Sequence, residues 1–188
     1  MRVIAGEKRG LILYEPKNNA IRPTSDKVKG AIFNSIQWDL DKNSVFADLF
    51  GGSGAMSIEA ISRGAKQAYV FDINKTSIDL IKKNISKAQY EDRIVVKQIS
   101  AAEGINQLAI REIRCDFIFM DPPYIHGDET VDLMKKISEK KILNSNGIIM
   151  IEHEKSVIIP NVICSYQKLK EKKYGNTLVS FFREAENE

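Results

Sequence analysis

The sequence predicts a single α/β domain with a mostly parallel sheet, and three observations lead to this prediction. Short apolar runs alternate with amphipathic stretches from residue 45 onward. The runs are apolar throughout, which is typical of parallel strands covered by helices on both faces. The last two segments alternate between apolar and polar residues instead, as the strands of an antiparallel hairpin do. With 188 residues, the chain can bury a core without disulfides or a structural metal.

The predicted elements follow one another in a regular order. Apolar runs predict five parallel strands, at residues 45–50, 68–72, 93–98, 116–121 and 147–152. Helical spacing of apolar residues predicts helices over 55–61, 78–85 and 131–137, with a helical segment near 108–110. A terminal hairpin completes a sheet of seven strands, with strands at 162–169 and 176–183 and the charged segment 170–175 between them.

Residues 1–44 precede this pattern and form an N-terminal extension of the domain. Two apolar runs, 2–4 and 11–14, suggest a small β-hairpin. The segment Pro23-Thr24-Ser25-Asp26 has the composition of a helix start and is followed by apolar residues at helical spacing. We therefore expect one domain over 1–188, with an extension at 1–44 and a core at 45–188.

Composition argues against several classes of protein. No apolar run approaches the roughly 20 residues that span a bilayer, and the charged N-terminus does not resemble a signal peptide. The cysteines Cys115 and Cys164 lack metal-ligand spacing, and unpaired cysteines fit a reducing compartment. We expect a cytoplasmic protein with no membrane partner and no metal, in which both cysteines are buried.

Positive charge gathers at the N-terminus. Residues 1–30 contain seven Lys or Arg and three acids, a net charge of +4, whereas the rest of the chain carries −1. A basic segment on a neutral body is typical of a surface that binds phosphates. Composition alone is equally consistent with a basic segment that is exposed to solvent and binds no phosphate.

A glycine-rich turn joins the first predicted strand to the first helix of the core. Asp48 lies near the end of the strand predicted over 45–50, and the turn reads Phe50-Gly51-Gly52-Ser53-Gly54. Glycines let a backbone approach a ligand, and a helix N-terminus offers free N–H groups to a carboxylate. Asp72 ends the next strand, where an acid can accept hydrogen bonds from both ribose hydroxyls. Because open α/β sheets bind ligands at the carboxyl ends of their strands, we predict a nucleoside site here.

Two other interpretations of this turn compete with an adenosine site. The dinucleotide fingerprint requires a third glycine, where this chain has Ser57, and the Gly-Lys-Ser/Thr of a phosphate-binding Walker loop is absent. A glycine turn can also be only a tight connection. The acids before and after it favour the nucleoside.

The segment Asp121-Pro122-Pro123-Tyr124 follows the fourth predicted strand. An exocyclic amine of a base is a poor nucleophile, because its lone pair is delocalised into the ring. The Asp121 carboxylate and the Pro122 carbonyl can accept hydrogen bonds from the two N–H groups of the amine, and the prolines hold these acceptors in place. Tyr124 offers a face on which a flipped base can stack. This pattern predicts methylation of a base nitrogen.

Several segments carry a resemblance to a known family. It extends over Arg2-Val3-Ile4-Ala5-Gly6 with Arg9-Gly10, Arg22 to Lys29, Phe33-Asn34, Asp48 to Gly54, Glu59-Ala60 with Ser62 to Ala65, and Asp121 to Tyr124. These residues resemble the ribosomal small-subunit methyltransferase D family, which methylates N2 of guanine 966 in bacterial 16S rRNA. The resemblance implies a class I (Rossmann-like) methyltransferase fold, S-adenosyl-L-methionine as cofactor and S-adenosyl-L-homocysteine as product.

The resemblance also implies roles for individual residues. The expected catalytic residues are Asp121, Pro122, Pro123 and Tyr124. The expected cofactor-binding residues are Asp48, Phe50, Gly51, Gly52, Ser53, Gly54, Asp72, Ile73, Ser100, Ala101 and Asp121. The expected RNA-binding residues are Arg2, Lys8, Arg9, Arg22, Thr24 and Lys27. The implied partner is 16S rRNA in an assembled or assembling 30S subunit, bound by a monomer.

The chain departs from the family pattern at three positions. Ser100 stands where an acid often approaches the adenine, Asp72 stands where Glu is common, and Gly30 replaces a usual charged residue. Two alternatives stay open: an adenine-N6 methyltransferase acting on DNA or RNA, and a catalytically idle RNA-binding assembly factor.

Overall fold

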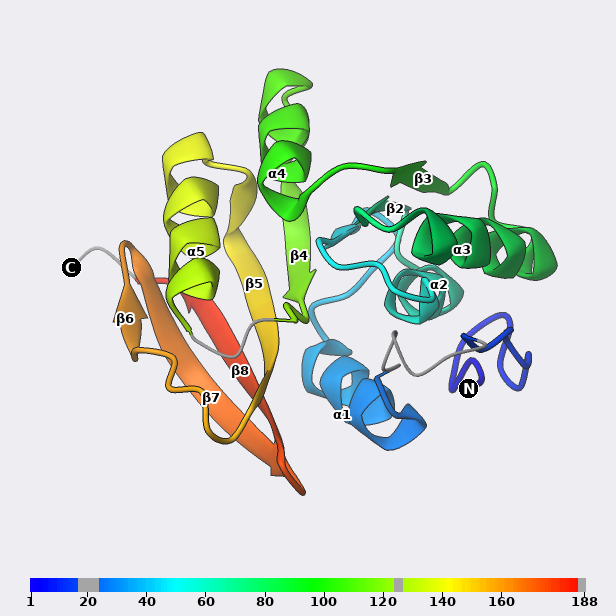
Figure 1. Cartoon of the computed structure of the whole chain (residues 1–188), viewed down its shortest axis with the longest axis horizontal. Coiled ribbons are helices and arrows are strands. Elements are labelled where there is room, and N and C mark those ends of the chain that lie inside the picture. Colours follow the sequence, from blue (N-terminus) through cyan, green and yellow to red (C-terminus); the bar gives the residue numbers. More distant parts are fainter. Residues whose placement is uncertain (17–23, 124–126, 186–188) are drawn as a thin grey trace. The chain divides into compact units, whose positions relative to one another are not determined.

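The computed structural model describes residues 1–16, 24–123 and 127–185 (Figure 1). Of the predicted site residues, Arg22 and Tyr124 lie outside the described residues. The chain divides into two compact units, Met1–Ser100 and Ala101–Glu188. Among the described residues, no helix has the length and apolar character needed to cross a membrane.

The first unit contains three parallel strands in the order β3-β2-β1. These are β1 (Val45–Asp48), β2 (Gln67–Phe71) and β3 (Ile94–Lys97). Asp48 pairs with Val70, and Phe71 pairs with Lys97. The carboxyl ends of the three strands therefore lie at one edge, the arrangement that the apolar runs predict.

Three helices accompany these strands: α1 (Asp26–Ile36), α2 (Ala55–Ser62) and α3 (Lys75–Ala88). Ser25 caps α1 by accepting a hydrogen bond from the Val28 amide, as the helix-start pattern predicts. All eight residues of α2 are buried, so this short helix lies inside the unit. Figure 1 shows α2 beside α3, with which it is in contact.

The N-terminal segment forms a tight loop that packs on the end of α2. The expected hairpin is reduced to one bridge, between Arg2 and Ile12, supported by a hydrogen bond of 2.9 Å from the Val3 amide to the Leu11 carbonyl. Gly6 lies in the left-handed region with φ of +83°, and a Cβ atom there would lie 1.8 Å from the Ser62 carbonyl oxygen. Only glycine allows this approach.

The second unit contains five strands in the order β4-β5-β8-β7-β6. Parallel strands β4 (Cys115–Met120) and β5 (Leu143–Glu154) are followed by the antiparallel strands β8 (Thr177–Glu184), β7 (Tyr166–Tyr174) and β6 (Val162–Ile163). Helices α4 (Ala101–Ile110) and α5 (Asp128–Lys140) pack against each other. The described residues thus contain the seven expected strands. The strand expected over 162–169 begins at Tyr166 instead, while Val162 and Ile163 form the separate antiparallel strand β6.

Two expectations for the second unit are wrong. The terminal hairpin does not turn over 170–175, because β7 continues to Tyr174, which pairs with Thr177 and leaves a two-residue turn. Its lysines cover apolar residues of β8: the Lys170 Nζ lies 4.9 Å from the centre of the Phe181 ring. Cys164 is exposed rather than buried, with φ of +52° in the connection between β6 and β7.

Candidate cofactor and substrate site

The glycine-rich turn is fastened to the end of β2. The Gly51 amide donates a hydrogen bond of 2.8 Å to the Phe71 carbonyl, and the Gly54 amide donates one of 2.7 Å to the Gly51 carbonyl. Gly54 caps α2 with φ of +78°. The turn therefore begins at the buried end of β1 and leads directly into a helix N-terminus, which attracts anions.

Gly51 has a packing role that the sequence does not reveal. A Cβ atom at this position would lie 2.4 Å from Cγ1 of Val70 and 2.8 Å from Cδ1 of Ile81. Both distances are far below a van der Waals contact. A larger residue here would force the Val70 and Ile81 side chains to move, so strand β2 and helix α3 favour glycine whatever ligand the turn binds.

Asp72 follows β2 and is held by backbone amides on both sides of its carboxylate. Oδ2 accepts a hydrogen bond of 2.9 Å from the Gly52 amide, and Oδ1 accepts one of 2.8 Å from the Asn74 amide. The side chain is half-buried. Each carboxylate oxygen retains a further lone pair, so both can also accept a hydroxyl.

Asp48 is the most perturbed carboxyl group near the turn. Burial, with a smaller contribution from the neighbouring Asp72 charge, raises the pKa of Asp48 to about 7, although a hydrogen bond of 3.3 Å from the Phe50 amide opposes the shift. A buried carboxyl group of this kind is stabilised in its charged form by a nearby cation. Perturbed acids of this type are frequent at functional sites.

The remaining predicted cofactor residues have different environments. Ile73 is exposed beside Asp72, and Ser100 is half-buried at the end of the first unit. Ala101 is buried and begins α4 in the second unit. Ser53 is buried, and its hydroxyl lies 3.3 Å from the Met1 sulfur, so its side chain contacts the N-terminal segment.

The second unit carries the predicted acceptor residues. Asp121 follows Met120, the last residue of β4, which pairs with Ile151 of the parallel strand β5. Asp121 and Pro122 are half-buried, and Pro123 is exposed. The described part of this segment thus leaves a buried strand at its carboxyl end, the position that the sequence predicts.

The described members of the predicted RNA-binding set, which leave out Arg22, lie on the N-terminal loop and at the start of α1. Arg9 and Lys27 are exposed, and Thr24 is half-buried. The Arg2 Nε lies 3.6 Å from the Asp26 carboxylate, with most of the arginine side chain in solvent. Lys8 is half-buried, and its Nζ lies 5.6 Å from the centre of the Tyr90 ring. The cationic groups of the arginines and lysines in this set can serve as phosphate contacts.

Lys29, one of the seven basic residues of the N-terminal segment, is fully buried. Its Nζ donates a hydrogen bond of 2.6 Å to the Arg2 carbonyl and lies 3.6 Å from the Glu59 carboxylate. Burial lowers the pKa of Lys29, and the Glu59 charge opposes this shift. Glu59 also accepts hydrogen bonds from the Ile4 and Ala5 amides, at 2.8 and 3.0 Å. Lys29 therefore joins the N-terminal loop to α1 and α2 and is not available to RNA.

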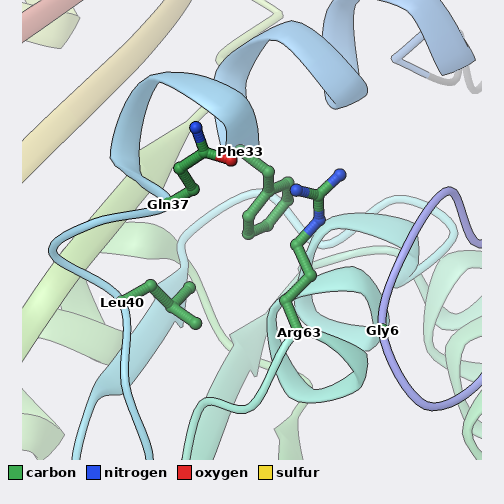
Figure 2. A pocket seen from close by; sticks show the side chains of 5 residues that line it. All are labelled: Gly6, Phe33, Gln37, Leu40 and Arg63. Carbon is green, nitrogen blue, oxygen red and sulfur yellow. The ribbon is translucent and has the colours of Figure 1, made fainter.

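A small cavity of about 200 Å³ lies next to this cluster (Figure 2). Its lining residues are Gly6, Phe33, Gln37, Leu40 and Arg63. The Arg63 guanidinium lies 5.2 Å from the centre of the Phe33 ring, and its Nε donates a hydrogen bond of 2.7 Å to Glu59. Arg63 is therefore fixed by the same carboxylate that holds the N-terminal loop.

Known proteins with similar sequences cover nearly the whole chain. The putative rRNA methyltransferase YlbH of Bacillus subtilis is 33% identical over 183 residues, which cover 97% of this chain and 98% of that protein. The ribosomal RNA small subunit methyltransferase D of Haemophilus influenzae is 32% identical over 179 residues, which cover 93% of this chain and 89% of that protein.

Solved structures share the fold. The putative methyltransferase yhhF from Escherichia coli has a TM-score of 0.85 at 24% identity and covers 99% of both chains. A conserved hypothetical protein of Streptococcus pyogenes is 32% identical, with a TM-score of 0.76 over 84% of this chain and 96% of that one. The chain thus has the α/β fold of these structures, with a mostly parallel sheet and antiparallel terminal strands.

A family model covers almost the entire chain as well. The model described as "Conserved hypothetical protein 95" matches residues 1–183. This match includes the N-terminal loop, the glycine-rich turn and Asp121. The chain therefore belongs to the Conserved hypothetical protein 95 family, together with relatives named ribosomal RNA small subunit methyltransferase D.

Proposed function

We propose that this chain transfers the methyl group of S-adenosylmethionine to the exocyclic N2 amine of a guanine in 16S rRNA. The family resemblance implies that this guanine is at position 966. The observation that carries this proposal is the pair of carboxyl groups at the ends of β1 and β2. Asp48 is buried with a pKa of about 7, and Asp72 is hydrogen-bonded to the glycine-rich turn. The names of the relatives, which describe rRNA methyltransferases, support the same activity.

The donor set around the turn fits this cofactor. When bound, S-adenosylmethionine supplies an electrophilic methyl group on a sulfonium, and its methionine part carries an ammonium. Asp48 would hold the cationic part of the molecule, since a nearby positive charge favours its ionised form. Asp72 would accept the ribose hydroxyls, and the N-terminus of α2 would attract the carboxylate.

The acceptor groups would act on the target amine. The Asp121 carboxylate and the Pro122 carbonyl would accept hydrogen bonds from the two N–H groups of this amine. These hydrogen bonds would direct the nitrogen lone pair toward the methyl group. The bound cofactor would supply the methyl group, its S–C bond breaking as the new N–C bond forms, and the nitrogen would then release a proton to water. No strong base is needed, because the amine becomes acidic only after it has gained the methyl group. Tyr124 would stack on the base.

The exposed cations of the N-terminal segment would bind the RNA backbone. Arg9 and Lys27 project into solvent, and Arg2 is mostly exposed. With Arg22, these groups would contact phosphates of an assembled or assembling 30S subunit in the cytoplasm, with the protein acting as a monomer.

Analysis of labelled nucleosides tests this proposal. The protein is incubated with methyl-labelled cofactor and small subunits from a strain that lacks the modification, and the rRNA is digested to nucleosides. We expect N2-methylguanosine. N6-methyladenosine would favour the adenine alternative, and an absence of label would favour an idle assembly factor.

A further inference from the structure

Asn84 is a fully buried amide on α3 that binds two separate segments of the first unit. Its Oδ1 accepts a hydrogen bond of 2.7 Å from the Tyr14 amide, and its Nδ2 donates one of 3.1 Å to the Tyr14 carbonyl. The same Nδ2 donates a second hydrogen bond of 2.9 Å to the Ser53 carbonyl. One side chain therefore joins the N-terminal segment to the glycine-rich turn.

This connection is sensitive to small movements of either segment. Asn84 lies between Ile81 and Ile85 along a helix, and both isoleucines are buried. In such an apolar environment, a lost partner leaves a buried polar group unsatisfied, at a cost larger than the net value of the hydrogen bond itself. The turn and the segment therefore favour one common arrangement.

A second contact joins the same two segments. The Ser53 hydroxyl lies 3.3 Å from the Met1 sulfur, and the Leu13 amide donates a hydrogen bond of 3.0 Å to the Met1 carbonyl. Ser53 thus contacts the N-terminal segment through its side chain and Asn84 through its backbone. The turn is thus connected to Leu13 through Met1 and to Tyr14 through Asn84.

The residue that Asn84 holds is exposed on its other side. Tyr14 is an exposed aromatic residue, with 51% of its surface accessible to solvent. The Lys87 Nζ lies 4.4 Å from the centre of its ring. An exposed aromatic ring beside a lysine is a surface on which an RNA base can stack while its phosphate meets a cation.

We propose that Asn84 is a positioning residue that couples RNA binding by the N-terminal segment to cofactor binding at the glycine-rich turn. This inference rests on the proposed function. Cofactor binding orders the turn, the turn holds Asn84, and Asn84 holds Tyr14 in the position that contacts RNA. Because coupling between two sites is reciprocal, bound RNA tightens cofactor binding by the same factor.

The first test uses the unmodified protein and amide hydrogen exchange. We expect saturating S-adenosylhomocysteine to slow exchange at the Tyr14 amide as well as at the turn. Binding of S-adenosylhomocysteine without a change at Tyr14 overturns the coupling and leaves the proposed function intact. If S-adenosylhomocysteine does not bind, the proposed function and the coupling both fail.

The second test compares two variants. Asn84→Ala removes the connection, whereas Ser62→Ala removes two hydrogen bonds to the same segment, at Ala5 and Lys8, far from the turn. The dissociation constant of S-adenosylhomocysteine is measured with and without unmethylated small subunits. We expect the subunits to lower this dissociation constant at least about fivefold in the unmodified protein and in Ser62→Ala.

In Asn84→Ala we expect this factor to fall well below its value in Ser62→Ala, because only the contact between Ser53 and Met1 still joins the two segments. The variant still binds both ligands. A factor that persists in Asn84→Ala, or that is absent from the unmodified protein, overturns the inference. If Asn84→Ala does not fold, the hydrogen-exchange experiment on the unmodified protein decides the question.

Discussion

Replacing Asp48 by asparagine tests whether the end of β1 is built for a cation. The buried carboxyl group has a pKa of about 7, against 3.8 in an unstructured chain. A shift of this size corresponds to about 4 kcal/mol between the two protonation states. The folded protein holds the Asp48 proton more tightly than the unfolded chain does. Stability therefore falls as the pH rises from 3.8 to about 7 and then levels off.

The asparagine side chain in Asp48→Asn has no proton to lose, so the variant avoids this penalty. Between pH 5 and pH 8, we expect the unmodified protein to lose about 2–3 kcal/mol more unfolding free energy than Asp48→Asn does. Urea denaturation of both proteins, without cofactor, measures this difference. We also expect Asp48→Asn to bind S-adenosylhomocysteine more weakly, because the carboxylate that holds its cationic part is gone.

Asp79→Asn is a suitable control, because Asp79 is exposed on α3 in the same unit. We expect its pH profile to follow that of the unmodified protein. Parallel profiles for Asp48→Asn and the unmodified protein would refute the reasoning, since they would mean that Asp48 ionises in the folded state at no extra cost. Tighter binding of S-adenosylhomocysteine by Asp48→Asn would remove Asp48 from the cofactor site.

Three further changes test the acceptor group, the N-terminal loop and the RNA surface. We expect Asp121→Ala to abolish methyl transfer but largely retain S-adenosylhomocysteine binding by calorimetry; unchanged turnover would exclude Asp121 from the reaction. Backbone strain alone should cost Gly6→Ala about 1–3 kcal/mol of unfolding free energy. We expect thermal unfolding to show a larger loss, because the new Cβ atom would overlap the Ser62 carbonyl oxygen. Gly10→Ala, with similar φ but open space around it, should show only the strain, and equal losses would contradict this account. Charge reversal at Arg9 and Arg22 should weaken small-subunit binding and flatten its salt dependence; unchanged affinity at low salt would argue against this RNA surface.

Local sequence patterns predicted much of the architecture. The apolar runs located the five parallel strands within a few residues, and the Thr24-Ser25-Asp26 segment located the start of α1. The family resemblance, carried by short motifs, is confirmed by the family-model match over residues 1–183 together with the relatives named ribosomal RNA small subunit methyltransferase D. The roles of the individual site residues stay predictions.

Other expectations failed where charge suggested exposure or a turn. The lysines of residues 170–173 suggested a loop, but cross-strand pairing with β8 extends β7 through them. Lys29 belonged by sequence to a basic surface, yet Glu59 and the Arg2 carbonyl compensate its burial. The hairpin partner β8 follows β7 after only two residues, so here the charge of the segment outweighed a pairing signal that was local. For Lys29 the deciding partners, Arg2 and Glu59, lie far along the chain, so no local pattern could reveal its burial.

The sequence by itself thus determined the order of the elements and the motifs at their ends, because the periodicity of apolar residues reflects which faces are buried. Only the tertiary structure decided that Gly51 makes room for Val70 and Ile81, and that Asn84 binds both Tyr14 and Ser53. The role of a buried amide, or of a glycine that lacks a side chain, depends on the atoms that pack against it. Those atoms come from segments that only folding brings together.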